Sequence, residues 1–343
     1  MSLLFNNANI GKLELKNKVV MAPMCMYSSD DSGKIKPFHH YHYVARAVGG
    51  VGLIIIEATA VEPRGRISNR DLGLWDDEQI KKHKKLNKKI KLFGAKTAIQ
   101  LAHAGRKCEV VDCVPIAPSS IPFSSKAPYK IPKEASLKEI KEIKSSFLKS
   151  AFRAKRAGYD ALELHAAHGY LLCEFLSNLS NTRDDKYGGT LENRCRLVLE
   201  IANDLIQNVK LPLIVRISAD EWMNKGWDIN DSIYLSKELE KLGVDAIHVS
   251  SGGNQSAPEK APVIGPLYQV DWAKKIKSEL KKTSVIAVGL ITNAVESEYL
   301  LKNKYCDFVA FGRALLKNPN LTFTLANDLH KKDEIELSYV RAF

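Results

Sequence analysis

Short apolar runs alternate with longer amphipathic stretches along most of the chain. The runs are rich in β-branched residues and almost continuously hydrophobic, which is typical of parallel strands that are covered on both faces. The stretches between them have the spacing of helices with one buried face. Eight runs are therefore predicted to be strands: Val19–Met21, Leu53–Ala58, Lys96–Gln100, Ala161–His165, Leu213–Ser218, Ala246–Ser250, Val285–Val288 and Phe308–Gly312.

A short motif recurs at the turn before three of these strands. Gly158-Tyr159-Asp160, Gly243-Val244-Asp245 and Tyr305-Cys306-Asp307 each follow a helical stretch and lead into an apolar run. In the first two, the glycine is placed to adopt the left-handed conformation that ends many helices. Eight such units favour a closed (β/α)8 TIM barrel over an open doubly wound sheet, and no Gly-x-Gly-x-x-Gly motif follows the first strand.

The length of 343 residues agrees with one barrel that carries insertions, so we expect residues 1–343 to form a single domain. The one long connection, residues 103–132, follows the third strand and contains five prolines. Loops of this length are usually functional, and proline stiffens them, so we expect this loop to wall the active site. A tail near residues 335–343 ends the chain.

The composition is that of a soluble globular protein, with 45% hydrophobic and 26% charged residues. Residues 1–11 carry no basic segment followed by an apolar one, so we expect no signal peptide. The longest apolar run, residues 51–58, is too short to cross a bilayer. We therefore expect a cytoplasmic protein without membrane contact.

Six cysteines are scattered along the chain, and no two of them form a Cys-x-x-Cys pair. This spacing argues against a zinc ribbon or a cysteine-ligated iron–sulfur cluster, so no metal is expected. Reduced thiols are the expected state in a cytosolic chain.

The net charge of +12 raises the question of a nucleic-acid partner. The lysines lie mainly on predicted helix faces, as at residues 81–89, and acidic residues alternate with them elsewhere, as at residues 138–142. No stretch combines aromatic and basic residues on one strand. Solvated helix faces explain the charge, and we expect no nucleic-acid partner.

Polar residues and glycines gather where the predicted strands end. In a TIM barrel the carboxyl ends of the strands form the active site, whereas the opposite end is structural. Gly289 and Gly312 follow the seventh and eighth strands, where such barrels commonly bind phosphate with backbone N–H groups. Arg313 would add charge-assisted hydrogen bonds. The alternative is that both glycines only form tight turns.

The pair His165-x-x-His168 has three interpretations. The two imidazoles could ligate a metal, could be structural, or could donate two hydrogen bonds to a developing oxyanion. Zinc would need a third ligand, for which Glu163 and Glu174 are the nearest candidates in sequence. Glu163 is expected to point to the same side of the strand as His165.

Four more residues at strand ends have a functional and a structural interpretation. Tyr27 and Tyr170 could donate a proton or simply pack. Cys25 is either a small buried apolar residue or a reactive thiol. Arg216 is either part of a core ion pair or a cofactor contact.

Several stretches at these positions are similar to motifs of one family. They are residues 17–27 (NKVVMAPMCMY), 100–107 (QLAHAGRK), 165–170 (HAAHGY), 177–183 (SNLSNTR), 185–189 (DKYGG), 192–194 (ENR) and 288–292 (VGLIT). The similarity extends from Leu4 to Phe343. The chain resembles the old yellow enzymes and, within that family, the bacterial YqjM-like class of FMN-dependent ene-reductases.

The resemblance implies that FMN lies across the barrel mouth. Gln100 would hydrogen-bond the pyrimidine edge of the flavin, and Arg216 would lie near its N1 and O2 atoms. Cys25 would lie beside the ring and tune its potential, where larger yeast-type enzymes have threonine. The implied cofactor-binding residues are Ala22, Pro23, Met24, Cys25, Ala58, Gln100, Arg216, Ser251, Gly252, Gly289, Gly312 and Arg313.

The resemblance also implies an NADPH:enone oxidoreductase, with NADH as the alternative hydride donor. NADPH would reduce FMN, and flavin N5 would pass hydride to the C=C bond of an α,β-unsaturated carbonyl compound; quinones and nitro compounds are further candidate substrates. Tyr170 would protonate the α-carbon while His165 and His168 hold the carbonyl oxygen. The other substrate-binding residues would be Tyr27, Lys107 and Arg341.

Three alternative functions remain at this point. A dienoyl-CoA reductase would need a cysteine cluster and further domains, which we do not expect here. A non-redox isomerase or aldolase would need a carboxylate base or a Schiff-base lysine at a strand end, and Glu57 and Lys107 are the nearest candidates. A flavin-binding protein without catalysis would not need His165, His168 and Tyr170.

In the YqjM-like class an arginine of the C-terminal tail reaches into the active site of a neighbouring subunit. Arg341 is the matching residue, so a homodimer or homotetramer is expected; the alternative is a frayed terminus. This chain ends in Phe343 where the class often has tryptophan, and residues 254–266 form a longer loop than usual. Both differences are expected to alter the substrate pocket more than the flavin site.

Overall fold

The computed structural model describes residues 2–343, and within this range eight parallel strands close into a barrel. Neighbours pair in the order β3-β13-β12-β11-β10-β9-β6-β4, and β4 pairs back onto β3 to complete the ring. The strands are β3 (Val19–Met21), β4 (Leu53–Ala60), β6 (Lys96–Ala102), β9 (Ala161–Ala166), β10 (Leu213–Ser218), β11 (Ala246–Ser250), β12 (Ser284–Ala287) and β13 (Phe308–Phe311). The predicted TIM barrel is confirmed.

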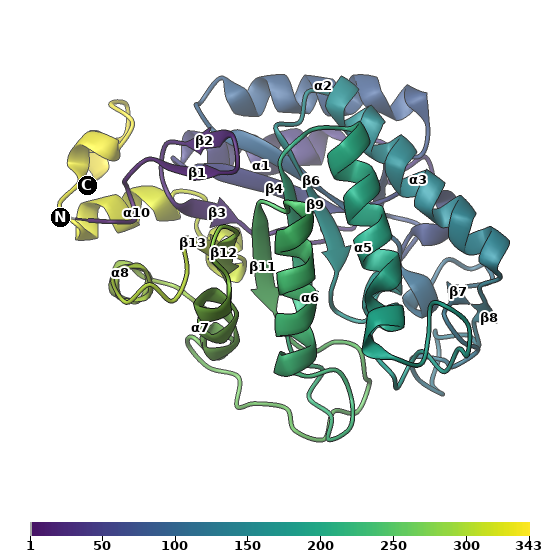
Figure 1. Ribbon diagram of the computed structural model, residues 1–343. Helices are drawn as coiled ribbons and strands as arrows, with labels where there is room; N and C mark the ends of the chain where they lie inside the picture. Colours follow the sequence, from purple (N-terminus) through teal and green to yellow (C-terminus); the bar gives the residue numbers. More distant parts are fainter. Residues whose placement is uncertain (1) are drawn as a thin grey trace.

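A helix follows each strand and packs on the outside of the barrel (Figure 1). These helices are α1 (Pro37–Val48), α2 (Asp77–Lys91), α3 (Leu137–Arg156), α5 (Leu191–Asn208), α6 (Ile229–Leu242), α7 (Val270–Glu279), α8 (Ala294–Lys302) and α10 (Leu321–Asp328). Local sequence fixes several helix ends. Ser136 and Glu139 form a capping box at the start of α3, and Gly243 ends α6 with φ +93°.

Smaller elements close or extend the barrel. The antiparallel hairpin of β1 (Ala8–Ile10) and β2 (Leu13–Leu15) lies at the end from which the strands start, and the loops that follow the strands gather at the other end (Figure 1). The remaining short elements are β5 (Leu72–Gly73), β7 (Ile116–Ala117), β8 (Lys133–Glu134), α4 (Leu171–Leu176), α9 (Arg313–Lys317) and the 3-10 turns η1 (Pro63–Gly65), η2 (Gly105–Lys107), η3 (Lys332–Glu334) and η4 (Val340–Ala342).

Alternate positions of each strand face two separate apolar cores. On β9, for example, Leu162 and Leu164 pack toward the helices, whereas Ala161 packs inside the barrel. Ile10 and Leu15 of the hairpin join this inner core, so the hairpin covers one mouth of the barrel. Toward the other end the inward positions of several strands become polar, although Ala22 and Val288 still belong to the inner core.

The predicted strands agree with the structure to within two residues at every end. Three of them coincide with β3, β10 and β11, whereas β4 and β6 each continue two residues further than predicted. The strand expected at residues 285–288 starts and ends one residue earlier. Gly158 has φ +82°, as expected for a residue that ends a helix in the left-handed conformation.

The long connection at residues 103–132 is more ordered in structure than the sequence alone suggested. It contains η2 and β7, and β7 pairs with β8 in parallel just beyond the loop. Within residues 2–343, no helix combines the length and the apolar composition that a membrane span requires.

Candidate active site

Polar side chains replace apolar ones toward the carboxyl ends of the strands. Inside the barrel, Ala161 of β9 is followed two and four residues later by Glu163 and His165. On β10 the same two-residue step leads from Ile214 to Arg216. Because successive inward positions stack in layers, the apolar floor near the hairpin carries a charged and polar layer above it.

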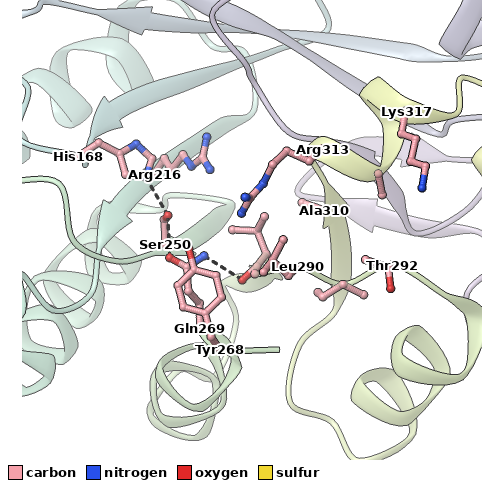
Figure 2. Close-up of a pocket in the computed structure, with 15 residues that line it drawn as sticks. His168, Arg216, Ser250, Tyr268, Gln269, Leu290, Thr292, Ala310, Arg313 and Lys317 are labelled. Atoms are coloured by element: carbon pink, nitrogen blue, oxygen red, sulfur yellow. Dashed lines mark hydrogen bonds between the residues drawn. The ribbon is translucent and has the colours of Figure 1, made fainter. Parts of the chain in front are cut away.

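A cavity of about 390 Å³ opens beside this polar layer. His168, Arg216, Gly289, Gly312 and Arg313 all line it, although they come from four different loops or strands. Both arginine side chains point into this space (Figure 2). Five of the residues predicted from sequence therefore meet at one cavity, as a phosphate-tethered cofactor would require.

The backbone at Gly289 has little room for a side chain. Its φ is +144°, and a Cβ at this position would lie 3.0 Å from the Cβ of Gln269. At Gly312, by contrast, the nearest atom to an added Cβ is the sulfur of Met24, at 3.6 Å. Gly289 is thus required by the local packing, whereas Gly312 keeps the backbone open toward the cavity.

The lining residues that the sequence analysis missed include Tyr268, Gln269 and Lys317. Gln269 accepts a hydrogen bond from Ser251 Oγ at 2.8 Å and donates one to the carbonyl of Val288 at 3.3 Å. It ends a long loop, and no local pattern marks it. Lys317 lies four residues after Arg313 on α9, a helical spacing from which it could have been found.

Arg216 is a buried cation with few partners. It is 7% exposed, one terminal nitrogen donates to the carbonyl of Pro23 at 3.4 Å, and its Nε has no partner among the described residues. Burial lowers the pKa of the guanidinium, and the charge of Glu163 opposes that shift. A buried cation at a cavity fits a cofactor with an anionic edge, such as FMN, whose reduced ring is anionic.

The two predicted imidazoles lie together. The ring centroids of His165 and His168 are 5.3 Å apart, and that of Tyr170 is 5.0 Å from His165. Nδ1 of His165 is buried and has no partner within the described chain. Burial, followed by the charge of Arg216, lowers the pKa of both histidines well below the usual range, so both are neutral at pH 7.

The hydrogen bond of His168 restricts what this ring can donate. Its Nε2 lies 2.7 Å from Ser250 Oγ, which also lies 3.2 Å from Gln269 Oε1 (Figure 2). If the hydroxyl group donates to Gln269, then Nε2 of His168 carries the proton. If it donates to Nε2, the proton is on Nδ1 and is free for a ligand. The direction in which the Ser250 hydroxyl donates therefore decides whether Nδ1 of His168 is a hydrogen-bond donor or an acceptor.

Cys25, Tyr27 and Tyr170 gather at the loop side of the site. Cys25 and Tyr170 both pack against a small apolar cluster that contains Ala104 and Cys108. Burial raises the pKa of the Cys25 thiol, and it also raises the pKa values of Tyr27 and Tyr170. All three groups are therefore protonated at neutral pH, and Tyr170 retains a proton that it can donate.

Lys107 joins three of the loops at the mouth. Its ammonium group donates to the carbonyls of His168 at 3.0 Å and Gly253 at 3.2 Å, and it lies 5.1 Å from the ring centroid of Tyr170. Burial lowers its pKa. Lys107 thus ties the loops to one another. Its contact with substrate stays a prediction.

The other predicted cofactor residues surround this centre without lining the cavity. Ala22 lies in the inner core, and its N–H donates to the carbonyl of Phe311. The Cys25 thiol contacts the backbone of Ala58. Gly252 has φ +69°, and the ring of Trp222 occupies the space that a Cβ would need at this position. Their predicted contacts with FMN are not tested by these positions.

The C-terminal tail packs away from this cavity. Tyr339 and Phe343 both pack against Phe323 of α10, with ring centroids 5.7 and 6.2 Å away. Arg341 is exposed in η4 and is not among the residues that line the cavity of its own chain. The predicted contact of Arg341 with a neighbouring subunit stays a prediction.

A metal interpretation of His165 and His168 finds no geometric support. Within residues 2–343, no three histidine, cysteine, aspartate or glutamate side chains converge as metal ligands would. Glu163 does point into the barrel with His165, as expected, but it is bonded to Gln100 and His248. All six cysteines lie in the described range and are free thiols.

Known proteins resemble this chain over nearly its whole length. Residues 3–332 match the NADH:flavin oxidoreductase / NADH oxidase family. The NADPH dehydrogenase of Bacillus pumilus is 47% identical over 341 residues, which are 99% of this chain and 99% of that protein. The NADPH dehydrogenase of Bacillus subtilis is 45% identical, again with 99% of each chain covered.

Two solved structures extend this similarity to the fold. Morphinone reductase superposes with a TM-score of 0.83 at 27% identity, covering 95% of this chain and 90% of its own. The old yellow enzyme homologue of Zymomonas mobilis also gives 0.83, at 26% identity, covering 95% of this chain and 92% of its own. The non-redox barrel is thereby left without support. The chain belongs to the NADH:flavin oxidoreductase / NADH oxidase family and is an FMN-dependent oxidoreductase of the old yellow enzyme type.

Proposed function

We propose that this enzyme uses NADPH to reduce the C=C bond of α,β-unsaturated carbonyl compounds. The observation that carries the proposal is the convergence of His168, which lines the cavity, with His165 and Tyr170: the ring centroid of His165 lies 5.3 Å from that of His168 and 5.0 Å from that of Tyr170. The relatives named NADPH dehydrogenase support NADPH as the hydride donor. Morphinone reductase, a structural neighbour, supports reduction of a small organic substrate.

FMN, when bound, supplies the hydride. Different residues would hold its phosphate group, its ring and its ribityl chain. Arg313 and the backbone at Gly289 and Gly312, all of which line the cavity, offer hydrogen bonds and charge to a phosphate group. Arg216 offers a buried positive charge to the ring, and Gln100 offers an amide. Ala22, Pro23, Met24, Cys25 and Ala58 would line the ring on the β3 and β4 side, and Ser251 and Gly252 would lie near the ribityl chain.

His165 and His168 would hold the carbonyl oxygen of the substrate. Two N–H groups aimed at this oxygen favour the negative charge that develops there when the β-carbon is reduced. Both rings are neutral, so each can donate from only one nitrogen. For His168 this requires that Ser250 donates to Nε2, which leaves the proton on Nδ1. The hydroxyl of Ser250 thus prepares His168 for substrate.

Tyr170 would deliver the proton that completes the reduction. Its raised pKa keeps the phenol protonated at neutral pH, and its ring lies beside that of His165. Tyr27, which is 41% exposed, would cap the pocket, and Lys107 would contact the substrate or hold the loops around it. The loop of residues 103–132 would wall the site within a single domain.

Arg341 would enter the active site of a neighbouring subunit in a homodimer or homotetramer. Its exposure and its place in the C-terminal tail leave it accessible to a second copy of the chain. Sedimentation of the wild type against Arg341→Ala, with 2-cyclohexenone kinetics on both, tests this assembly. Equal KM values in the two proteins would rule out the contact.

The proposed reaction can be followed by colour. The purified enzyme should be yellow, bleach with NADPH in the absence of oxygen, and regain its colour when 2-cyclohexenone is added. The double variant His165→Ala with His168→Ala should keep FMN and bleach normally but recover at least a hundredfold more slowly, since a single oxyanion donor contributes about 10²- to 10³-fold. Normal recovery in the double variant would refute the assigned role of the imidazoles.

A further inference from the structure

Beneath the imidazoles, four polar side chains form what we term the Glu163 cluster: Gln100, Glu163, Arg216 and His248. Glu163 Oε1 accepts a hydrogen bond from Gln100 Nε2 at 2.7 Å, and its Oε2 accepts one from His248 Nδ1 at 2.8 Å. Arg216 lies on the neighbouring strand, two residues beyond Ile214, which is paired with Glu163, and Glu163 is the largest charge effect on the pKa of Arg216. These residues come from four adjacent strands, β6, β9, β10 and β11.

Three side chains of the cluster are almost completely buried, and the fourth, Arg216, borders the cavity. Glu163 and His248 are 0% exposed, and Gln100 is 2% exposed. A charged side chain that is buried in this way loses its hydration, and only opposite charges and directed hydrogen bonds can offset that loss. The pKa of His248 is lowered by burial and then by Arg216, so its ring is neutral. Glu163 is therefore the acidic group of the cluster, and its charge opposes the effect of burial on Arg216.

The Glu163 carboxylate also fixes the orientation of the Gln100 amide. An ionised carboxylate only accepts hydrogen bonds, so the amide nitrogen of Gln100 must face Glu163. The amide oxygen of Gln100 is then free to accept a hydrogen bond from a ligand. An oxygen accepts from the imide N–H of a flavin, whereas a flipped amide would present N–H groups to it and clash electrostatically.

We propose that Glu163 is a positioning residue for the cofactor, which holds the Gln100 amide with its oxygen outward and partly neutralises Arg216. The inference rests on the proposed placement of FMN against Gln100 and Arg216. It assigns to Glu163 two separable effects. One acts through Gln100 on FMN affinity, and the other acts through the electrostatic field on the redox potential.

Glu163→Gln separates these effects from a purely structural role, because it preserves the shape of the side chain. The amide both donates and accepts, so Gln100 loses its single orientation, and the dissociation constant of oxidised FMN should rise roughly three- to tenfold. Arg216 loses its counter-charge and attracts the anionic reduced ring more strongly. Reduced FMN should bind about tenfold more tightly relative to oxidised FMN, which corresponds to a rise of about 30 mV in the two-electron midpoint potential.

Glu298→Gln is the matched control. Glu298 is also a buried carboxylate with several donors, namely Ser2 Oγ and the backbone N–H groups of Leu3 and Leu4, but it lies on α8 and outside the cavity. Its substitution should lower the melting temperature without moving FMN affinity or potential. A Glu163→Gln variant that behaves in the same way would have a structural role only, and the inference would be wrong.

The third variant is Gln100→Ala, alone and combined with Glu163→Gln. If Glu163 acts on affinity through Gln100, the second substitution adds no further loss of FMN binding. The rise in potential should persist in the double variant, because it depends on charge alone. Additive losses of affinity, or an unchanged potential, would each overturn one of the two assigned effects.

The measurements are fluorescence titration of apoprotein with FMN and spectroelectrochemical titration of the holoenzyme, neither of which depends on turnover. Wild-type apoprotein that fails to bind FMN would overturn the proposed cofactor site and the Glu163 inference together. Wild type that binds FMN, beside a Glu163→Gln variant with the same affinity and potential, would overturn the Glu163 inference alone.

Discussion

The carboxyl group of Glu57, a residue of β4, is held between α1 and the loop that carries Cys25 and Tyr27. It is 1% exposed. The backbone N–H of Met26 donates to its Oε2 at 2.8 Å, and the hydroxyl of Tyr43 donates to its Oε1 at 3.0 Å. Burial is the main cause that raises the pKa of Glu57 from 4.5 to about 7, against the opposing effect of these hydrogen bonds.

The consequence for stability follows from linkage. Between pH 4.5 and 7 the folded state binds the proton of Glu57 more tightly than the unfolded chain does, so stability falls as the pH rises through this window. At about 1.4 kcal/mol per pH unit, the full loss is about 3 kcal/mol and is complete above pH 7. Acidification should thus stabilise the fold near this loop.

Glu57→Gln removes the titrating group and is the test. Urea unfolding of wild type and variant at pH 5, 6, 7 and 8 gives the difference in unfolding free energy at each pH. The stability of the variant relative to wild type should rise by about 2 to 3 kcal/mol between pH 5 and pH 8, because only wild type loses the contribution of the protonated carboxyl group. Asp71, whose pKa burial raises to about 6, titrates in both proteins, and its charge contributes to the raised pKa of Glu57. A difference that stays constant from pH 5 to pH 8 would refute the assignment of a raised pKa to Glu57.

Three further substitutions test the site. Tyr170→Phe should slow reoxidation of the reduced enzyme by an enone about 10²- to 10⁴-fold while its reduction by NADPH is unchanged, as stopped-flow absorbance would show; equal slowing of both half-reactions would contradict its role as proton donor. Arg313→Ala should weaken FMN binding at least tenfold in fluorescence titration and reduce its dependence on salt; binding that is unaltered would place the phosphate elsewhere. Lys107→Met should lower the melting temperature by a few degrees through loss of two bonds to backbone carbonyls, and a variant that also loses substrate affinity would support direct contact with substrate.

The barrel was predictable because its determinants are local. Apolar runs of three to eight residues, each followed by an amphipathic stretch, leave few alternatives to parallel strands and covering helices. The hairpin at Ala8–Leu15 was not predicted, since its short strands, ANI and LEL, each contain a polar residue and form no continuous apolar run. Its role depends on the inner core that it covers, which becomes visible only when the ring is closed.

The positions of the site residues were predictable, whereas their hydrogen bonds were not. Strand ends of a TIM barrel converge, so Gly289, Gly312, Arg313, Arg216 and His168 could be expected near one another, and they line one cavity. The hydrogen bonds among them could not be expected. Ser250 and His168 are 82 residues apart, and only the closed barrel brings Ser250 Oγ to 2.7 Å from His168 Nε2.

The sequence by itself determined the number and order of the strands, the helices between them, and the residue types at each strand end. It also determined that Glu163 and His165 share one face of their strand, because side chains alternate along a strand. Only the tertiary structure decided that Glu163 meets His248, 85 residues later, rather than a metal or a substrate. The physical reason is that alternation fixes the side to which a residue points, whereas the stagger of strands around the closed barrel fixes which other residues it meets there.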